Sequence, residues 1–277
     1  MPIPQLTPRY RLHGVSIFLS ASVPTPERRE EYERIPEAPL RIEEAVVCIA
    51  RAIFMEGGTL VFGGHPSISP LVARVVDHYY LPAPAEKTHR GGDRESHDVQ
   101  WKNPSLVIYQ SRVWEKHWAE TTERLARHPL VRIEWTKGVD GESVDPAVKD
   151  RPQAPRSMKK MREEMVENTS PIAMIAIGGM KGVLDEAQIF ADLRPRKPIF
   201  ALATTGGAAA MLSRREEYRD RVQVTDIDAE DLVRKFWKQQ EGDQAPDRIG
   251  EEDRRKFYVP YAFVAQRIVA QIVKNSN

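Results

Sequence analysis

The chain has 277 residues, with 41 Lys and Arg against 40 Asp and Glu, and one cysteine. The formal net charge of +1 argues against a nucleic acid as partner, because nucleic-acid-binding surfaces usually carry a clear excess of positive charge. The lone Cys48 excludes an intrachain disulfide and a multi-cysteine zinc site. The absence of a signal sequence and of roughly 18 consecutive apolar residues predicts a soluble, cytoplasmic protein without membrane contact.

Patterns typical of buried strands alternate with helical patterns along the chain. Strands are predicted over residues 15–23, 59–62, 105–109, 131–135, 171–177, 198–203 and 222–224. Helices are predicted over residues 40–56, from Ser69 as N-cap onward, and over 113–126, 158–167, 183–193, 229–239 and 261–273. Loops are predicted at 82–103 and 241–256. The alternation predicts an α/β fold with a doubly wound, mostly parallel sheet and helices on both faces.

We expect a single domain over residues 1–277. A polar insertion near 137–156, rich in proline, glycine and charge, is interpreted as a mobile insertion or a hinge. The last apolar helical pattern predicts a C-terminal helix near 261–274, which could pack on the sheet or on another subunit.

Three predicted strands end at, or within two residues of, paired glycines. The turns contain Gly63-Gly64-His65, Gly178-Gly179-Met180-Lys181-Gly182 and Thr204-Thr205-Gly206-Gly207, and a helical pattern follows each. Ligands of open α/β sheets bind beyond the carboxyl ends of the strands, where glycines and helix N-termini present backbone N–H groups to anions. The three turns therefore favour a small phosphate-bearing ligand, although tight turns that bind nothing are the alternative. The motifs G-x-G-x-x-G and G-x-x-x-x-G-K-S/T are missing, which disfavours standard dinucleotide dehydrogenases and P-loop phosphotransferases.

The first two turns resemble those of the SLOG superfamily, which unites DprA-like proteins with LOG phosphoribohydrolases. Residues 60–72, LVFGGHPSISPLV, are similar to the first glycine turn of that family, and residues 177–186, IGGMKGVLDE, to its P-G-G-x-G-T-x-x-E signature. Ile177 stands in place of the proline, Val183 in place of the threonine, and one extra residue separates the glycines. The resemblance covers roughly residues 15–214 and implies a Rossmann-like fold.

Glu186, at the end of this signature, is the candidate catalytic residue if the protein is a hydrolase. In LOG enzymes the corresponding glutamate helps to cleave an N-glycosidic bond. In a sensor it could accept hydrogen bonds from ribose hydroxyls, and near a helix N-terminus it is favourable through the helix dipole alone.

The candidate ligand-binding residues lie at the strand ends and in the turns. Lys181 could pair with a phosphate, and His65 could donate to a phosphate or a ribose. The serines near the end of the first strand could contribute hydroxyl groups. Together the residues expected to bind the ligand are Ser20, Ser22, Gly63, Gly64, His65, Gly178, Gly179, Met180, Lys181, Gly182, Thr205, Gly206 and Gly207.

Two side-chain patterns have plainer interpretations. Trp114 and Trp118 are four residues apart on a predicted helix, which favours a core or interface role over a base-stacking platform. Met158, Met161 and Met165 follow helical spacing and suit a packed face or a subunit contact.

The function that these observations favour is the binding or sensing of a nucleotide, or of a ligand derived from NAD or ADP-ribose. The departures from the signature resemble SLOG branches in bacterial signalling and defence, which implies a TIR-domain or other effector protein as a possible partner. One alternative is a LOG-like nucleoside monophosphate phosphoribohydrolase that uses Glu186. A scaffold that binds no ligand is the other. We expect no cofactor, no metal ion, and assembly into a homo-oligomer.

Overall fold

The computed structural model describes residues 10–24, 38–79, 105–117, 120–148, 153–226 and 259–275. Within them the strands form one sheet in the order β4-β3-β2-β1-β5-β6-β7, and every neighbouring pair is parallel. The strands are β1 Ser16–Ser22, β2 Thr59–Phe62, β3 Leu106–Ser111, β4 Val131–Thr136, β5 Met174–Gly178, β6 Ile199–Leu202 and β7 Val222–Gln223. The predicted α/β fold class with a parallel sheet is confirmed.

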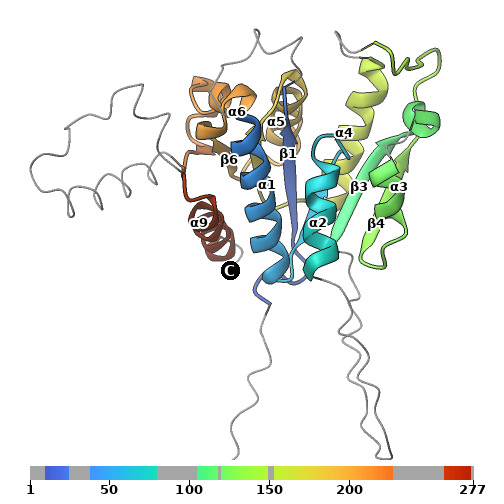
Figure 1. The fold of residues 1–277 in the computed structure, drawn as a ribbon. Helices are drawn as coiled ribbons and strands as arrows, with labels where there is room; N and C mark the ends of the chain where they lie inside the picture. The colour runs from blue at the N-terminus through green and yellow to red at the C-terminus, as the bar shows by residue number, and fades with distance from the viewer. Residues whose placement is uncertain are drawn as a thin grey trace, which may run out of the picture.

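Helices cover both faces of this sheet (Figure 1). One layer contains α1 Ala38–Met55, α2 Ser69–Tyr79, α3 Glu120–Ala126 and α9 Tyr261–Lys274. The other contains α4 Pro155–Thr169, α5 Lys181–Leu193 and α6 Gly207–Leu212. Short 3₁₀ helices are η2 Arg112–His117, η3 Ala203–Thr205 and η4 Glu216–Tyr218.

The central strand β1 is buried on both faces, which explains the consecutive apolar residues Ile17, Phe18 and Leu19. Ile17 and Leu19 belong to the core beneath α1 and α9, whereas Phe18 points into the opposite core. There the Phe18 ring packs on Phe190 of α5, with 6.2 Å between the ring centroids. Each face of the sheet therefore has its own apolar core.

The order of the strands reverses between β1 and β5. The chain proceeds outward from β1 through β2 and β3 to β4, and then returns to add β5 on the other side of β1. In an open α/β sheet a crevice forms at such a reversal, beyond the carboxyl ends of the strands. Ser22 and Gly178, the last residues of the two strands, are partners in the sheet at this point.

The helix predicted over 113–126 differs most from the structure. Residues 112–117 form η2, and α3 begins at Glu120. Ser69 is not the N-cap of α2 as predicted but its first helical residue, and its hydroxyl donates to the carbonyl of His65 at 3.2 Å. The strand predicted from residue 171 begins only at Met174.

The remaining predicted strands and the C-terminal helix are confirmed within a few residues at their ends. The predicted loops at 82–103 and 241–256, the predicted helix at 229–239 and Trp118 lie outside the described residues. Among the helices that the structure describes, none has the length and apolarity needed to cross a membrane.

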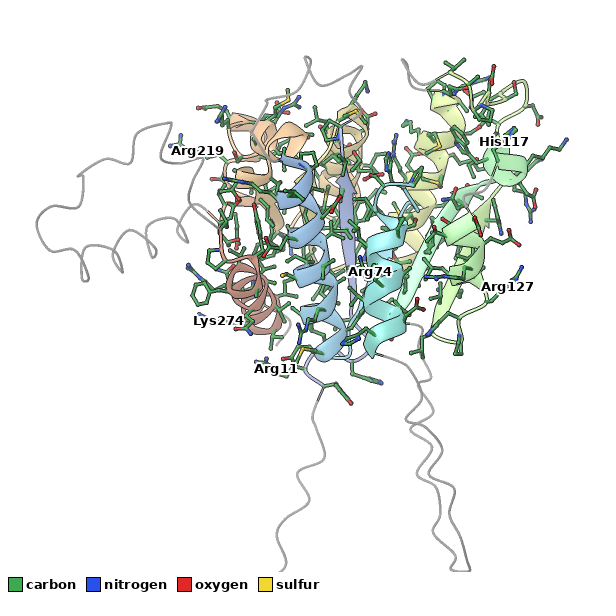
Figure 2. All side chains as sticks on the ribbon, viewed as in Figure 1. Arg11, Arg74, His117, Arg127, Arg219 and Lys274 are labelled. Atoms are coloured by element: carbon green, nitrogen blue, oxygen red, sulfur yellow. The ribbon has the colours of Figure 1, made fainter. Side chains whose placement is uncertain are left out.

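Charged side chains are spread around the molecule. The labelled basic residues Arg11, Arg74, Arg127, Arg219 and Lys274 lie at separate places on it (Figure 2). These five labelled residues do not line up as a basic stripe.

Candidate functional site

A pocket of about 750 Å³ lies at the carboxyl ends of the strands, between α4 and α5 and beside the reversal of strand order. Of the residues predicted to bind a ligand, those that line it are Ser22, His65, Met180, Lys181 and Gly182. Its other lining residues are Trp114, Val148, Gln153, Pro155, Met158, Lys159, Arg162, Asp185, Gln188 and Ile189. The pocket thus joins the first and second glycine turns with side chains of α4, α5 and η2.

Arg162 of α4 presents a largely buried guanidinium group to the pocket, with 15% of its side chain exposed. Its Nε donates to Oε1 of Glu186 at 3.2 Å, and its Nη1 lies 3.7 Å from Oδ2 of Asp185. Nη2 lies against Gly182, where an added Cβ would be 3.1 Å away. In the part of the chain that the structure describes, Nη2 donates to no acceptor, so it remains open to a ligand.

Glu186 lies beneath the pocket and is not among its lining residues. Both of its carboxylate oxygens are engaged, Oε1 by Arg162 and Oε2 by the hydroxyl of Ser20. Burial raises the pKa of this carboxyl above its usual range, and Arg162 and the hydrogen bond from Ser20 oppose that shift. These contacts make Glu186 a group that orients Arg162. Ser20, which we expected to contact the ligand, donates its hydroxyl hydrogen bond to Glu186 instead.

The first glycine turn is fixed by Gln110 of β3. Its side-chain amide donates to the carbonyls of Gly63 at 3.3 Å and Gly64 at 3.2 Å. A Cβ at Gly64 would lie 2.2 Å from the nitrogen of that amide, and Gly64 has a φ of +61°. This glycine pair holds the turn in place, and His65, which follows it, lines the pocket.

The imidazole of His65 is held in a desolvated position. Burial, followed by the nearby Arg162 guanidinium, lowers the pKa of His65 from 6.5 to about 4. The ring is therefore neutral at physiological pH.

In the second glycine turn, the first two backbone N–H groups already have partners. That of Gly178 donates to the hydroxyl oxygen of Thr205 at 2.8 Å, and that of Gly179 to the carbonyl of Ser22 at 2.8 Å. The N-terminus of α5, which begins two residues later, has no side-chain cap. This helix N-terminus faces the pocket, which Met180 and Gly182 line.

The third turn supports the second and is not brought to the pocket. Thr205, Gly206 and Gly207 are buried, and none of them lines the pocket. A Cβ at Gly207 would lie 2.6 Å from the carbonyl oxygen of Gly179, and Ala208 donates to that oxygen at 3.0 Å. The lack of a Cβ at Gly207 allows the third turn to pack against the second.

Lys181 lies at the rim of the pocket with 59% of its side chain exposed. Its Nζ is 2.5 Å from Oδ1 of Asp185, four residues along α5. Surface ion pairs such as Lys181–Asp185 contribute little stability. The position of Lys181 at the rim leaves its amine near the pocket entrance.

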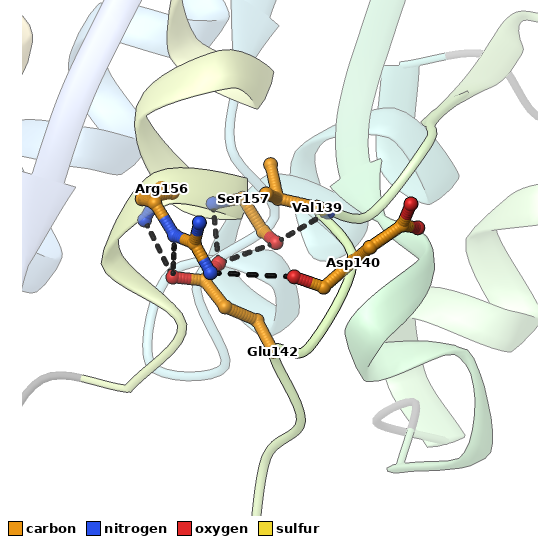
Figure 3. Close-up of polar contacts among 5 residues, drawn as sticks. All are labelled: Val139, Asp140, Glu142, Arg156 and Ser157. Atoms are coloured by element: carbon orange, nitrogen blue, oxygen red, sulfur yellow. Dashed lines mark hydrogen bonds and ion pairs between the residues drawn. The ribbon is translucent and has the colours of Figure 1, made fainter.

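The segment expected to be a mobile insertion or a hinge is folded onto α4 in its described part (Figure 3). The carboxylate of Glu142 accepts hydrogen bonds from the backbone N–H groups of Arg156 at 3.0 Å and Ser157 at 2.7 Å, and from the hydroxyl of Ser157 at 2.6 Å. Desolvation raises the pKa of Glu142, but these bonds outweigh it and lower the pKa to about 2. A distant carboxylate therefore caps α4, which begins at Pro155 inside the predicted insertion.

Gln153, just before α4, shapes one wall of the pocket. The Gln153 side chain binds the backbone of Asp145 and Val148 at 2.7 to 2.9 Å. Val148, Gln153 and Pro155 consequently line the pocket.

The sequence interpretation missed Arg162, Gln188 and Trp114 as pocket residues. Arg162 stands four residues after Met158 and so shares a helix face with it. The nearby Met161 and Met165 are buried against the sheet, as the packed-face interpretation expected. An arginine beside the apolar methionine stripe of this helix was the sequence signal that could have pointed to Arg162.

In the described part of the chain, no three His, Cys, Asp or Glu side chains gather as a metal site would require.

Comparison with known families identifies the chain. The model of the SLOG cluster3 family matches residues 95–236, which is just over half of the chain. The chain belongs to the SLOG cluster3 family. The matched range of this SLOG protein contains α4 with Arg162, the second and third glycine turns and Glu186, and it begins after the first glycine turn.

Among solved structures, the X-ray structure of TM1055, a structural genomics target, is similar with a TM-score of 0.41 and 14% sequence identity. The alignment covers 73% of this SLOG chain and 81% of TM1055. No curated protein matches the sequence.

Proposed function

We propose that the pocket binds a small nucleotide-type ligand through its phosphate, and that the protein acts as a binding or sensing component rather than as a hydrolase. The observation that carries this proposal is the open Nη2 of Arg162, a largely buried cation held beside the uncapped N-terminus of α5. Membership of the SLOG cluster3 family supports a nucleotide-related role.

The polar end of the pocket consists mainly of hydrogen-bond donors. Besides Arg162, it contains the ring of His65 and the hydroxyl of Ser22, which has no hydrogen bond to another described residue. A helix N-terminus stabilises an anion by about 0.3–1 kcal/mol, and a hydrogen bond to a charged group contributes about 1.5–3 kcal/mol. Donors converging from three elements fit the oxygens of a phosphate.

The other lining residues suit the remainder of a nucleotide. Trp114, Met158 and Ile189 offer apolar surface, and the volume of about 750 Å³ falls in the usual range of small-molecule sites. A nucleobase presents a flat, largely apolar face that aromatic side chains bind by stacking. Trp114 thus takes the stacking role that its helical spacing alone did not favour.

The hydrolase alternative needs a carboxylate that faces the scissile bond. Glu186 is bonded through one oxygen to Ser20 and through the other to Arg162, and it does not line the pocket. The scaffold alternative leaves the open guanidinium unexplained. As a sensor, the protein would report ligand binding to a second copy of itself or to an effector such as a TIR-domain protein.

The test is a binding titration of the full chain with AMP, ADP-ribose, NAD and ribose 5-phosphate. We expect at least one of them to bind, and Arg162→Met to weaken that binding about 10- to 100-fold, the equivalent of about 1.5–3 kcal/mol. Lys160→Met is the matched control, because Lys160 is on the same helix, pairs with Glu164 at 3.8 Å and does not line the pocket.

A double variant, Arg162→Met with Glu186→Gln, removes the cation without leaving a buried carboxylate unpaired, and so separates lost binding from lost folding. Two results would refute the proposal. One is that no phosphate-bearing compound of the panel binds, and the other is that Arg162→Met binds as well as Lys160→Met. Release of free base from AMP would restore the hydrolase alternative.

A further inference from the structure

One ring nitrogen of His65 is bound twice by the same neighbour. The backbone N–H of Ser67 donates to Nδ1 of His65 at 3.3 Å, and the hydroxyl oxygen of Ser67 lies 2.9 Å from the same Nδ1. The hydroxyl oxygen also accepts a hydrogen bond from the backbone N–H of Val23 at 3.1 Å. Ser67 thus connects the imidazole to the chain just after β1.

These contacts determine where the imidazole proton lies. A backbone N–H group can only donate, so Nδ1 must accept and carries no proton. The Ser67 hydroxyl, which already accepts from Val23, then donates its own proton to Nδ1. In a neutral imidazole the remaining proton is on Nε2. The lowered pKa of His65, about 4, agrees with a neutral ring, and Arg162 on α4 is the charged group that faces it.

The Nε2 atom is available to the pocket. His65 lines the pocket, its Nδ1 edge is held by Ser67, and Nε2 has no hydrogen-bond partner in the described part of the chain. We propose, building on the proposed function above, that Ser67 locks His65 as the Nε2-protonated tautomer, so that the ring donates one hydrogen bond to an acceptor oxygen of the ligand.

The proposal restricts the chemistry of the ligand. A fixed Nε2–H group donates to a phosphate or hydroxyl oxygen and cannot accept a hydrogen bond from an ammonium group. His65 is then a ligand contact that cannot take up a proton at Nε2, and Ser67, which does not line the pocket, is a positioning residue that acts through it.

A purely structural role for Ser67 is the competing explanation, since it also lies in the turn before α2. Ser69 provides the matched control. Its hydroxyl donates to the backbone carbonyl of His65 at 3.2 Å and makes no hydrogen bond to the ring. Both serines therefore stabilise the same turn, but only Ser67 sets the position of the ring proton.

The experiment is long-range ¹⁵N–¹H NMR of the histidine side chains in the full chain at pH 7, with His65→Gln to assign the signal. We expect an unprotonated Nδ1 and a protonated Nε2 in the free protein. Ser67→Ala keeps the backbone N–H that donates to Nδ1 but loses the hydroxyl donor, so the Nδ1-protonated tautomer should become partly populated and binding of AMP should weaken about 2- to 10-fold, the effect of losing one hydrogen bond. Ser69→Ala should change neither, and Ser67→Thr, which keeps the hydroxyl, should restore both.

A protonated Nδ1 in the wild-type protein would overturn the inference even if AMP binds through Arg162, and a tautomer ratio unchanged in Ser67→Ala would overturn the role of the Ser67 hydroxyl in setting it. So would equal losses of AMP affinity in Ser67→Ala and Ser69→Ala, because they would reduce Ser67 to a turn residue. If the tautomer is as stated but AMP, ADP-ribose, NAD and ribose 5-phosphate all fail to bind, the proposed function is refuted and the ligand contact of His65 with it.

Discussion

Replacing Gly207 by alanine should destabilise the protein through the contact between the second and third glycine turns. The added Cβ would lie 2.6 Å from the carbonyl oxygen of Gly179 and 3.0 Å from the carbonyl carbon of Gly178, and the residue has a φ of +59°. A left-handed conformation costs alanine about 1–2 kcal/mol, and overpacking adds about 1–3 kcal/mol. The expected total is about 2–5 kcal/mol.

Gly141→Ala isolates the packing contribution. Gly141 has a φ of +81°, but nothing lies within 4 Å of its added Cβ. This variant should therefore lose only the conformational cost of about 1–2 kcal/mol. The two variants should differ by about 1–3 kcal/mol, or roughly 2–10 °C in Tm for a protein of this size.

Urea denaturation followed by circular dichroism measures both variants, with unchanged m values as the sign that only stability has altered. If Gly207→Ala is no more destabilised than Gly141→Ala, the third turn does not support the second. Gly207 would then return to the residues expected to contact the ligand.

The remaining predictions concern the pocket and its cap. Glu186→Ala should lower the free energy of unfolding by about 3–5 kcal/mol, because Arg162 would remain buried without its partner, and denaturation measures this loss. Glu142→Gln should be less stable than the wild type at pH 7. Since the folded pKa of Glu142 is lowered to about 2, the stabilisation is complete above pH 4.5 and is lost as the pH falls toward 2, as denaturation at several pH values should record. Trp114→Ala should weaken binding of AMP about 5- to 100-fold but leave ribose 5-phosphate unaffected, as titration would measure.

Each of these predictions has a contrasting outcome. Glu186→Gln retains an acceptor for Arg162 and should cost much less than Glu186→Ala, so equal losses would contradict the orienting role. A stability difference between Glu142→Gln and the wild type that persists at pH 2 would argue against the carboxylate cap of α4. Equal weakening of both ligands by Trp114→Ala would mean that the indole supports the pocket wall and does not stack on a base.

The fold could be predicted because its strands are buried on both faces. Apolar runs such as residues 60–62 stand out when a sheet is covered twice, and glycine turns mark where three of the strands end. The helix predicted over 113–126 was harder, since η2 and α3 are short pieces whose combined pattern imitates one longer helix.

The site could be predicted only where the residues are close in the sequence to a strand end. His65, Lys181 and Gly182 follow from the turns, but Arg162 depends on Glu186, 24 residues away, and the α4 cap depends on Glu142. Glycines were ambiguous for a physical reason. A residue without a Cβ suits the approach of a ligand and the approach of another backbone equally well, and Gly207 uses its freedom for the second.

The most direct test of the central claim is a crystal structure of the protein with AMP bound. We expect a phosphate oxygen within about 2.7–3.2 Å of Nη2 of Arg162, at the N-terminus of α5, with the adenine against Trp114. AMP bound elsewhere, or in this pocket with its phosphate directed away from Arg162, would contradict it.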